Sequence, residues 1–253
     1  MKARLIRNAT LYVEINGICI LIDPMLGKKG SLGPFPWTDD PRENPLTELP
    51  VNDEELTTII RNTDIVLLTH IHPDHWDETA RELITKNTMV YCQPGDKAAI
   101  EASGFTSVFP IENQLNYKGI SFIRTGAKHG LGKIGELMGN VSGFILKTDT
   151  ESLYITGDTI WCEEVSEALD THHPDYIIVN GGGARFSIGD HVTMNCDDIK
   201  TMHQHADYAR IAVIHLEAVS PAREDKERLR TFFSQHELTK DVIVPDDGYM
   251  IFN

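Results

Sequence analysis

The chain has 253 residues, of which 41% are hydrophobic and 24% charged, and this composition excludes a disordered protein. No segment approaches the roughly 18 consecutive apolar residues of a membrane span. The formal net charge of −15, without any dense run of Lys or Arg to offset it, excludes a nucleic-acid binder and favours a small-molecule partner. Four widely spaced cysteines without a C-x-x-C pair, and an N-terminus without a signal-peptide pattern, predict a cytoplasmic protein with free thiols.

The first half of the chain alternates strands, a long loop and helices. Two apolar runs, ATLYVEI and ICILIDP, flank Asn16-Gly17, a pair typical of a tight turn, and predict an antiparallel hairpin. Residues 26–50 are rich in Gly and Pro and predict a long loop, of a kind that usually serves as a lid or rim. Asn52, with Glu55 three residues later, indicates a helix start. DIVLLT then predicts a buried strand, and DETARELITK a helix.

The second half repeats this alternation of strands and helices. The strand-like runs are TMVYCQP, TSVFPI, KGISFIRTG, GFILKTD, SLYITGD, DYIIVNG, ARIAVIHLE and DVIVPDDGYMIF. The helix-like runs are GDKAAIEASG, EEVSEALD, NCDDIKTMHQHADY and AREDKERLRTFFSQHEL. Because strands and helices are interspersed, we expect two sheets with helices over their outer faces. No linker, repeat or low-complexity tract interrupts the chain, so we predict a single domain over residues 1–253.

The segment after DIVLLT concentrates side chains that bind metals. The pattern H-x-H-x-D-H is formed by His70, His72, Asp74 and His75. Residues two apart on an extended segment point the same way, so His70 and His72 can face one ion. The turn at Pro73 lets the next two residues face a neighbouring position. Imidazole and carboxylate suit zinc, manganese or iron, and a chance His-rich surface loop would not directly follow a buried strand.

Three more residues of ligand type close later strands. They are His129 after ISFIRTG, Asp158 in LYITGDT and His215 in RIAVIHLE. A polar residue at the end of a strand is ordinary by itself. Side chains at the ends of different strands can, however, converge on one edge of a sheet sandwich. Together with the early cluster, these residues predict a centre for more than one metal ion.

The order of these motifs resembles the metallo-β-lactamase superfamily over nearly the whole chain. The resemblance implies an α+β fold, an αββα sandwich of two mixed β-sheets flanked by helices, with two divalent metal ions, Zn or Mn. It implies that the ligands of the first ion are His70, His72 and His129. It implies that the ligands of the second are Asp74, His75 and His215, with Asp158 bridging the two.

Details of the motifs narrow the branch of the superfamily. Asp158 stands where the best-known zinc β-lactamases have a cysteine, which argues against antibiotic hydrolysis. His72 is not the Glu of the flavodiiron oxidoreductases, and the compact, acidic chain leaves little room for the cap or arm of the nucleases. THIHPDHWD and ITGDT are most similar to the branch containing L-ascorbate-6-phosphate lactonase and the N-acyl-phosphatidylethanolamine phospholipase D-like hydrolases.

The resemblance implies a dinuclear metal-dependent hydrolase. The two ions would lower the pKa of a shared water molecule toward about 7. The resulting bridging hydroxide would cleave a small, anionic ester, lactone or phosphodiester. Asp74 would ligate the metal and orient this nucleophile as a catalytic residue. A mononuclear iron oxidoreductase similar to persulfide dioxygenases and a non-catalytic metal-binding relative remain alternatives, and the sequence leaves open a homo-oligomer.

Five other polar residues are candidates around the metals. Asp23, in LIDP, would orient the ligand histidines or serve as a structural turn acid. His191, in the loop that begins at NGGGAR, would act as a catalytic residue on the open side of the metals or face solvent. Lys128, Lys133 and Arg185 lie in loops at the same edge and would grip an anionic substrate or simply be solvated.

Overall fold

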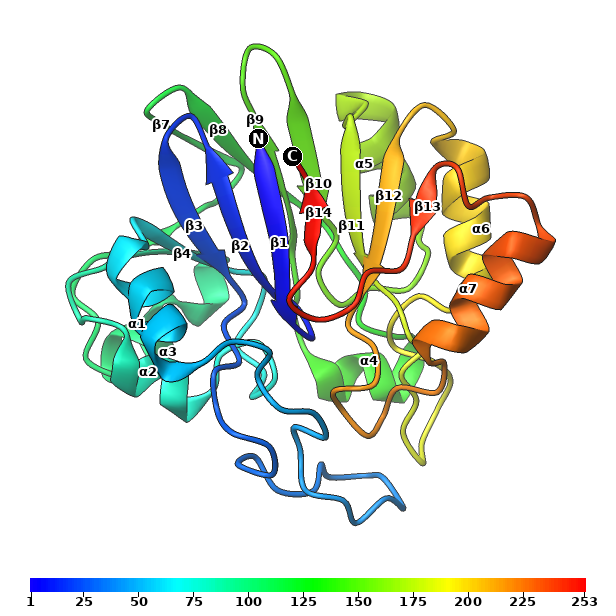
Figure 1. The fold of residues 1–253 in the computed structure, drawn as a ribbon, viewed down its shortest axis with the longest axis horizontal. Coiled ribbons are helices and arrows are strands. Elements are labelled where there is room, and N and C mark those ends of the chain that lie inside the picture. Colours follow the sequence, from blue (N-terminus) through cyan, green and yellow to red (C-terminus); the bar gives the residue numbers. More distant parts are fainter.

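The protein, described over residues 1–253 by a computed structural model, consists of two β-sheets packed face to face (Figure 1). The strands of the first sheet are β1 (Lys2–Arg7), β2 (Thr10–Ile15), β3 (Ile18–Ile22), β4 (Ile65–Leu68), β5 (Met89–Cys92), β6 (Val108–Pro110) and β14 (Met250–Phe252). The strands of the second are β7 (Gln114–Tyr117), β8 (Ile120–Thr125), β9 (Gly143–Lys147), β10 (Ser152–Ile155), β11 (Tyr176–Asn180), β12 (Arg210–Ile214) and β13 (Val242–Ile243). Their orders are β14-β1-β2-β3-β4-β5-β6 and β13-β12-β11-β10-β9-β8-β7.

Helices cover the outer face of each sheet, which confirms the predicted αββα sandwich. The helices on the first sheet are α1 (Asp53–Asn62), α2 (Glu78–Leu83) and α3 (Lys97–Ala102), the last preceded by the short 3₁₀ helix η1 (Pro94–Asp96). The helices on the second are α5 (Glu163–His172), α6 (Cys196–His205) and α7 (Lys226–Gln235). A further helix, α4 (Gly132–Met138), lies below the sheets in Figure 1, beside the loop of residues 26–50.

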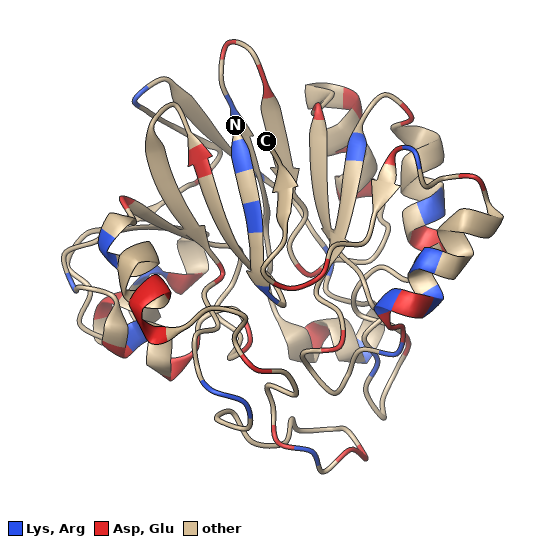
Figure 2. Ribbon diagram, viewed as in Figure 1, with Lys and Arg blue, Asp and Glu red and all other residues tan.

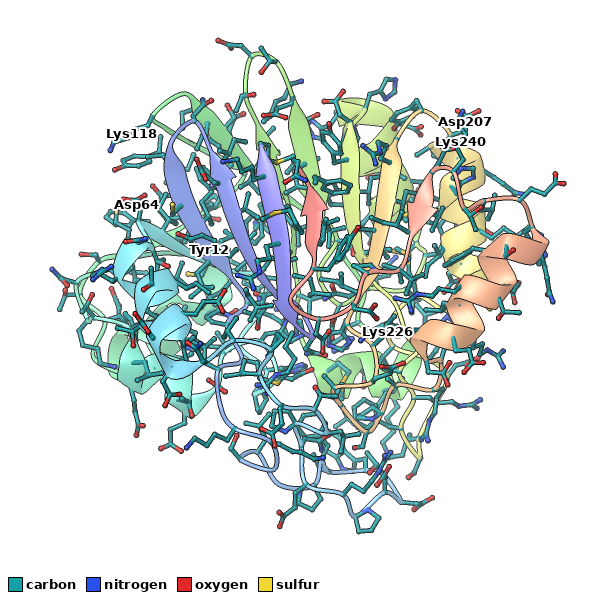
Figure 3. All side chains as sticks on the ribbon, in the orientation of Figure 1. Tyr12, Asp64, Lys118, Asp207, Lys226 and Lys240 are labelled. Atoms are coloured by element: carbon teal, nitrogen blue, oxygen red, sulfur yellow. The ribbon has the colours of Figure 1, made fainter.

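Three apolar layers hold this sandwich together. Side chains of both sheets, among them Leu67, Phe122 and Phe144, form one buried apolar cluster. With all side chains drawn, the space between the ribbons is filled (Figure 3). Two further clusters lie between each sheet and its helices. The central parallel strands β4 and β10 are buried along their whole length, as expected for strands covered on both faces. Charged residues of both signs lie mainly on helices and loops (Figure 2), and no helix has the length and apolarity needed to cross a bilayer.

Local signals in the sequence give several element boundaries correctly. Asn16 and Gly17 both have positive φ in the turn between β2 and β3, as a tight hairpin turn requires. The side chain of Asn52 accepts a hydrogen bond from the backbone N–H of Glu55 at 2.9 Å and caps α1. Residues 26–50 contain no helix and no strand beyond a single bridge, so the predicted long loop is confirmed.

Other elements differ from the sequence prediction. The run at 241–252, predicted as one strand, forms two short strands in different sheets, because Asp246, Asp247 and Gly248 turn the chain between them. The N-terminal segment forms a separate strand, β1, before the predicted hairpin. The edge strand β7 and the helix α4 were not predicted, since their apolar residues are few and show no clear period.

The topology brings the carboxyl ends of two sets of parallel strands to one edge of the molecule. In the first sheet β3, β4 and β5 are parallel, and in the second β10, β11 and β12 are parallel. Asp23 follows β3, and His70 lies just after β4. Asp158 follows β10, Asn180 ends β11, and His215 follows β12. Residues far apart in sequence therefore meet at this edge.

Candidate metal centre

The seven predicted ligands gather at this edge in two groups, and within each group the potential ligand atoms lie within 4.8 Å of one another. The first group consists of His70, His72 and His129. The second consists of Asp74, His75, Asp158 and His215. All except His72 are buried. Their composition of imidazole nitrogens and carboxylate oxygens is that of a transition-metal site, while their roles as ligands remain predictions.

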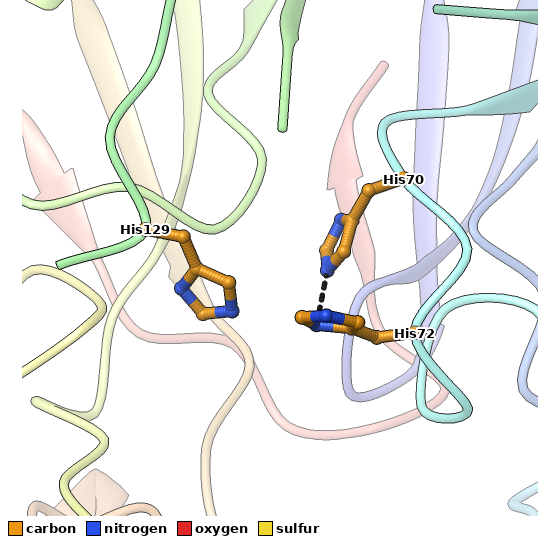
Figure 4. A group of neighbouring side chains, drawn as sticks. All are labelled: His70, His72 and His129. Carbon is orange, nitrogen blue, oxygen red and sulfur yellow. Dashed lines mark hydrogen bonds between the residues drawn. The ribbon is translucent and has the colours of Figure 1, made fainter. Parts of the chain in front are cut away.

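In the first group, three imidazoles face a common space (Figure 4). Nε2 of His70 and Nδ1 of His72 are 3.0 Å apart, as two atoms on one side of a shared ion would be. His129 comes from the segment after β8 in the other sheet, and its ring centroid lies 5.5 Å from that of His70 and 5.3 Å from that of His72. Each sheet therefore contributes to this group.

A backbone contact determines which nitrogen His129 presents. Its Nδ1 lies 2.8 Å from the carbonyl oxygen of Val192. A carbonyl oxygen can only accept a hydrogen bond, so Nδ1 carries the proton and donates it. Nε2 then faces the other ligands with a free lone pair, the form that binds a metal.

Asp23 fixes two more imidazoles in the same way. Its Oδ2 lies 2.9 Å from Nδ1 of His75 and accepts a hydrogen bond of 2.7 Å from the hydroxyl of Thr69. Because that hydroxyl donates to Asp23, its oxygen is left to accept from Nδ1 of His70, 3.0 Å away. One carboxylate thus turns Nε2 of both histidines toward the site, and the orienting role of Asp23 at a metal centre stays a prediction.

In the second group, Asp158 lies between the two sets of imidazoles. Its Oδ2 is 3.3 Å from Nε2 of His75, 3.5 Å from Nε2 of His129 and 3.6 Å from Nε2 of His215. Oδ2 of Asp74 is 3.1 Å from Nε2 of His215. A single oxygen of Asp158 is therefore close to nitrogens of both groups.

The charges at this edge fit a bound cation. The carboxylates of Asp23, Asp74 and Asp158 are buried, and none forms an ion pair with a Lys or Arg. Burying carboxylates is costly unless positive charge compensates them. Nε2 of His75 is also buried without a hydrogen-bond partner. Buried carboxylates without a Lys or Arg partner, beside an imidazole nitrogen without a hydrogen bond, are what a metal ion would satisfy.

The protonation states also favour a cation. Burial lowers the pKa of His129 to about 4 and that of His70 well below its usual range, so both imidazoles are neutral at neutral pH. Burial raises the pKa of Asp74, but His75 and His215 outweigh it and hold that pKa at about 2. Neutral imidazole and ionised carboxylate are the forms that coordinate metals. Burial also lowers the pKa of His75 and His215, but Asp158 and Asp74 outweigh it and raise the pKa of both, so a cation in the second group would displace their protons.

The backbone around the site adopts conformations that most residues avoid. Gly157, directly before Asp158, has φ +65°, and a Cβ there would lie 2.7 Å from the carbonyl oxygen of Ser142. Asp23 and His215 have φ of 45° and 64°, in the left-handed region that is unfavourable for residues with a Cβ. Such conformations persist where the surrounding structure requires them, and they cluster at functional sites.

The ligand groups open onto a cavity of about 270 Å³ whose other walls are apolar. The ligands that reach it are His72, Asp74, His129, Asp158 and His215. The remaining walls are formed by Phe35, Pro36, Trp37, Pro73, Leu137, Met138, Ala184, Phe186, Val192, Val219 and Pro221. The loop of residues 26–50 therefore supplies one wall, and no Lys or Arg lines the cavity.

His191 lies outside this cavity. Its Nε2 is 2.8 Å from Oδ2 of Asp198, a residue of the capping box that begins α6, and its Nδ1 is 3.4 Å from Oδ1 of Asp190. His191 is not among the residues that line the cavity. Its catalytic role remains a prediction that this arrangement does not support.

The three basic residues suggested for substrate binding also lie outside the cavity lining. Nζ of Lys128 forms an ion pair of 2.9 Å with Glu164, and Nη1 of Arg185 lies 4.0 Å from Asp190. Lys133 is exposed on α4. None of the three lines the cavity, so the structure gives no support to their proposed grip on an anionic substrate.

Two buried asparagines contact the carboxylate ligands and were missed. Nδ2 of Asn180 donates a hydrogen bond of 2.7 Å to Oδ1 of Asp158. Nδ2 of Asn8 donates to the backbone oxygen of Asp74 at 3.2 Å. Asn180 closes the apolar strand YIIVN, the same signal that marks the predicted ligands, and could have been found. Asn8 lies in a short turn and carries no such signal.

Known proteins resemble this chain over its whole length. Residues 19–216 match the family described as β-lactamase superfamily domain. YddR of Bacillus subtilis, a UPF0173 protein, is 35% identical over 253 residues, covering 98% of each chain. The crystal structure of a possible metal-dependent hydrolase from Veillonella parvula is 30% identical with a TM-score of 0.95, covering 100% of this chain and 99% of that one. An isothiocyanate hydrolase from Delia radicum gut bacteria is 30% identical with a TM-score of 0.93 and the same coverage.

Proposed function

The chain belongs to the β-lactamase superfamily and is a metal-dependent hydrolase, and from this premise we propose that it uses two divalent cations, Zn or Mn, to hydrolyse a small, uncharged organic substrate. The observation that carries the proposal is the pair of ligand groups that share Asp158 and open onto an apolar cavity. The ascorbate-6-phosphate lactonase branch has no support among the relatives described above.

The chain's own residues divide the work of holding the cations. His70, His72 and His129 would hold one, and Asp74, His75 and His215 the other, with Asp158 between them. Cations held there would lower the pKa of a water molecule and polarise the bond to be cleaved. Asp74 belongs to the second group and also lines the cavity, so its carboxylate can accept a hydrogen bond from an entering water molecule. This supports its predicted role in orienting the nucleophile.

The apolar cavity supports an uncharged substrate rather than the anionic one predicted from the sequence. An anion such as a phosphodiester is usually held by Arg or Lys, and neither lines the cavity. Phe35, Trp37 and Phe186 instead offer aromatic surface to an apolar substituent. An uncharged substrate loses little hydration on entry, whereas an anion would lose much.

Isothiocyanates are the substrate class that best combines these features. The structural relative from gut bacteria of Delia radicum is described as an isothiocyanate hydrolase. An isothiocyanate is small and uncharged, with an electrophilic carbon and an organic substituent. In hydrolysis, the oxygen of water bonds to this carbon, the carbon–nitrogen bond breaks and both protons of water end on the nitrogen. The products are a primary amine and carbonyl sulfide.

A substrate panel tests this proposal. Protein loaded with Zn²⁺ or Mn²⁺ is incubated with benzyl isothiocyanate, a neutral lactone and a phosphodiester, and the products are separated by chromatography. We expect benzylamine to accumulate, with little cleavage of the phosphodiester. The His70→Ala variant should lose metal and activity together, since His70 would ligate the first ion. Preferential cleavage of the phosphodiester, or full turnover by His70→Ala, would contradict the proposal.

A further inference from the structure

Asn180 holds one oxygen of Asp158 away from the space between the two ligand groups. Its Nδ2 donates a hydrogen bond of 2.7 Å to Oδ1 of Asp158. The other oxygen, Oδ2, lies 3.3 Å from His75, 3.5 Å from His129 and 3.6 Å from His215. The two oxygens of this carboxylate therefore have different surroundings, one amide donor on one side and three imidazoles on the other.

The orientation of the Asn180 amide follows from its partner. An ionised carboxylate can only accept hydrogen bonds, so the NH₂ end of the amide must face it. Both residues are buried. The amide oxygen of Asn180, Oδ1, has no hydrogen-bond partner. The contact with Asp158 is therefore the only side-chain hydrogen bond that Asn180 makes.

The fold fixes both partners of this contact. Asn180 is the last residue of β11, and Asp158 follows the neighbouring parallel strand β10. The backbone N–H of Asn180 donates to the hydroxyl of Thr156 at 3.4 Å, and Gly157 sets the turn that leads into Asp158. The backbone on both sides of this contact is therefore held by neighbouring strands.

We propose that Asn180 is a positioning residue that holds Oδ1 of Asp158, so that only Oδ2 would be free to contact both cations. This inference rests on the dinuclear centre proposed above. The terminal torsion of an Asp side chain has broad, roughly two-fold preferences, so an unrestrained carboxylate could rotate and give both oxygens to one ion. The hydrogen bond from Asn180 opposes that rotation and keeps one oxygen shared between both ligand groups.

Replacing Asn180 by Leu removes this hydrogen bond and keeps the branched shape of the side chain. Because the amide oxygen of Asn180 has no partner, no other side-chain hydrogen bond is lost. Asn195→Ala is the matched control, since Asn195 is also an asparagine with a structural hydrogen-bonding role, capping α6, but contacts no carboxylate ligand. The control should lower the melting temperature of the apo-protein without changing metal binding.

The readout is metal binding rather than turnover. Each apo-protein is titrated with Co²⁺, and the visible absorption of bound Co²⁺ is used to follow the occupancy of the two ligand groups. In a second measurement, the metal retained after dialysis against a chelator is counted by mass spectrometry. We expect two equivalents in the wild type and Asn195→Ala. In Asn180→Leu we expect the first ion to bind normally and the second roughly 10- to 100-fold more weakly, the usual effect of losing an orienting partner.

The outcomes separate this inference from the proposed function. Two equivalents bound with equal affinity by the wild type and Asn180→Leu overturn the role of Asn180 and leave the dinuclear centre intact. A single equivalent in the wild type overturns the dinuclear centre itself, and the bridging role with it. Circular dichroism of the apo-protein shows whether Asn180→Leu folds. If it does not, Asn180→Asp takes its place, because Asp has the same shape but presents an acceptor where Asn has the donor. We expect the same loss of affinity for the second ion.

Discussion

Oδ2 of Asp23 lies 2.9 Å from Nδ1 of His75, a residue 52 positions away in the chain. The same carboxylate accepts hydrogen bonds from the backbone N–H and the hydroxyl of Thr69, at 2.8 and 2.7 Å. Through Thr69 it also fixes His70. One acid at the end of β3 therefore orients a histidine of each ligand group, so its substitution should affect both cations.

Asp23→Asn tests this relationship with minimal change in shape, and Asn tolerates the positive φ of this position. The carboxylate accepts three hydrogen bonds, and an amide has only one oxygen, so at least one of them must be lost. We expect metal affinity to fall roughly 10- to 100-fold, measured by competition with a chromophoric chelator. Unchanged affinity for both cations would show that Asp23 is only a turn acid.

The candidate ligands could be picked out from the sequence because they follow apolar runs. The metal-binding chemistry of a His or Asp side chain can be read without knowing its neighbours. Asp158 and His215 follow the buried strands β10 and β12, and His129 follows the half-buried strand β8. The carboxyl ends of these strands meet at one edge. The start of α1 could also be predicted from a local signal, since the capping residue Asn52 lies three residues from its hydrogen-bond partner, Glu55.

Features that depend on contacts between distant segments could not be predicted. Asn8 meets Asp74 across 66 positions, and nothing in the turn around Asn8 indicates that contact. The wall formed by Phe35 and Trp37 depends on how the loop of residues 26–50 folds back, with the N–H of Ser187 donating to the carbonyl of Trp37 at 2.7 Å. The absence of basic residues from the cavity follows from this packing. Because the packing cannot be seen in the sequence, an anionic substrate was expected.

Gly157→Ala should destabilise the protein and displace Asp158. The φ of +65° at Gly157 costs a residue with a Cβ about 1–2 kcal/mol, and the added carbon would lie 2.7 Å from the carbonyl oxygen of Ser142. We expect a loss of about 2 kcal/mol or more in the free energy of unfolding, measured with urea. Gly17→Ala is the control, because Gly17 has a similar φ but no atom within 4 Å of its added Cβ. Equal losses in both variants would show that the contact with Ser142 contributes nothing.

Arg7 anchors the loop that forms the cavity wall. Its buried guanidinium donates to the carbonyl oxygens of Met25, Gly27 and Thr47 at 2.9, 2.7 and 3.0 Å. Burial lowers the pKa of Arg7 to about 10, so the group stays charged at neutral pH. Arg7→Met leaves these carbonyls without their charged donor, and we expect a loss of about 3 kcal/mol in the free energy of unfolding and faster proteolysis within residues 26–50.

The control for Arg7 is Arg4→Met. Arg4 contacts Glu55 and the carbonyl of Gly248 but is only partly buried, so its substitution should cost about 1 kcal/mol. Comparable losses in the two variants, or an unchanged cleavage rate in the loop of Arg7→Met, would contradict the anchoring role.

Removal of metal should lower stability without unfolding the protein. The buried carboxylates of Asp74 and Asp158 then have only imidazoles and the amides of Asn8 and Asn180 as partners. Cations that bind the folded state alone would stabilise it. At a free metal concentration 100 times the dissociation constant, binding adds about 2.7 kcal/mol. We expect the melting temperature to fall with a strong chelator and to rise again with added Zn²⁺ or Mn²⁺. A melting temperature independent of both additions would contradict metal binding by the folded chain.

A positive charge in the cavity should change the substrate preference. Leu137 lines the cavity and is 40% exposed, so Leu137→Lys can be accommodated without burying the ammonium group. If the cavity accepts uncharged substrates because it lacks cations, this variant should raise KM for benzyl isothiocyanate several-fold and lower KM for its para-carboxylate analogue. Leu83→Lys adds the same charge at a leucine on α2 that is 46% exposed and lies outside the cavity, and it should change neither value. Identical preferences in Leu137→Lys and the wild type would mean that the substituent does not occupy the space beside α4.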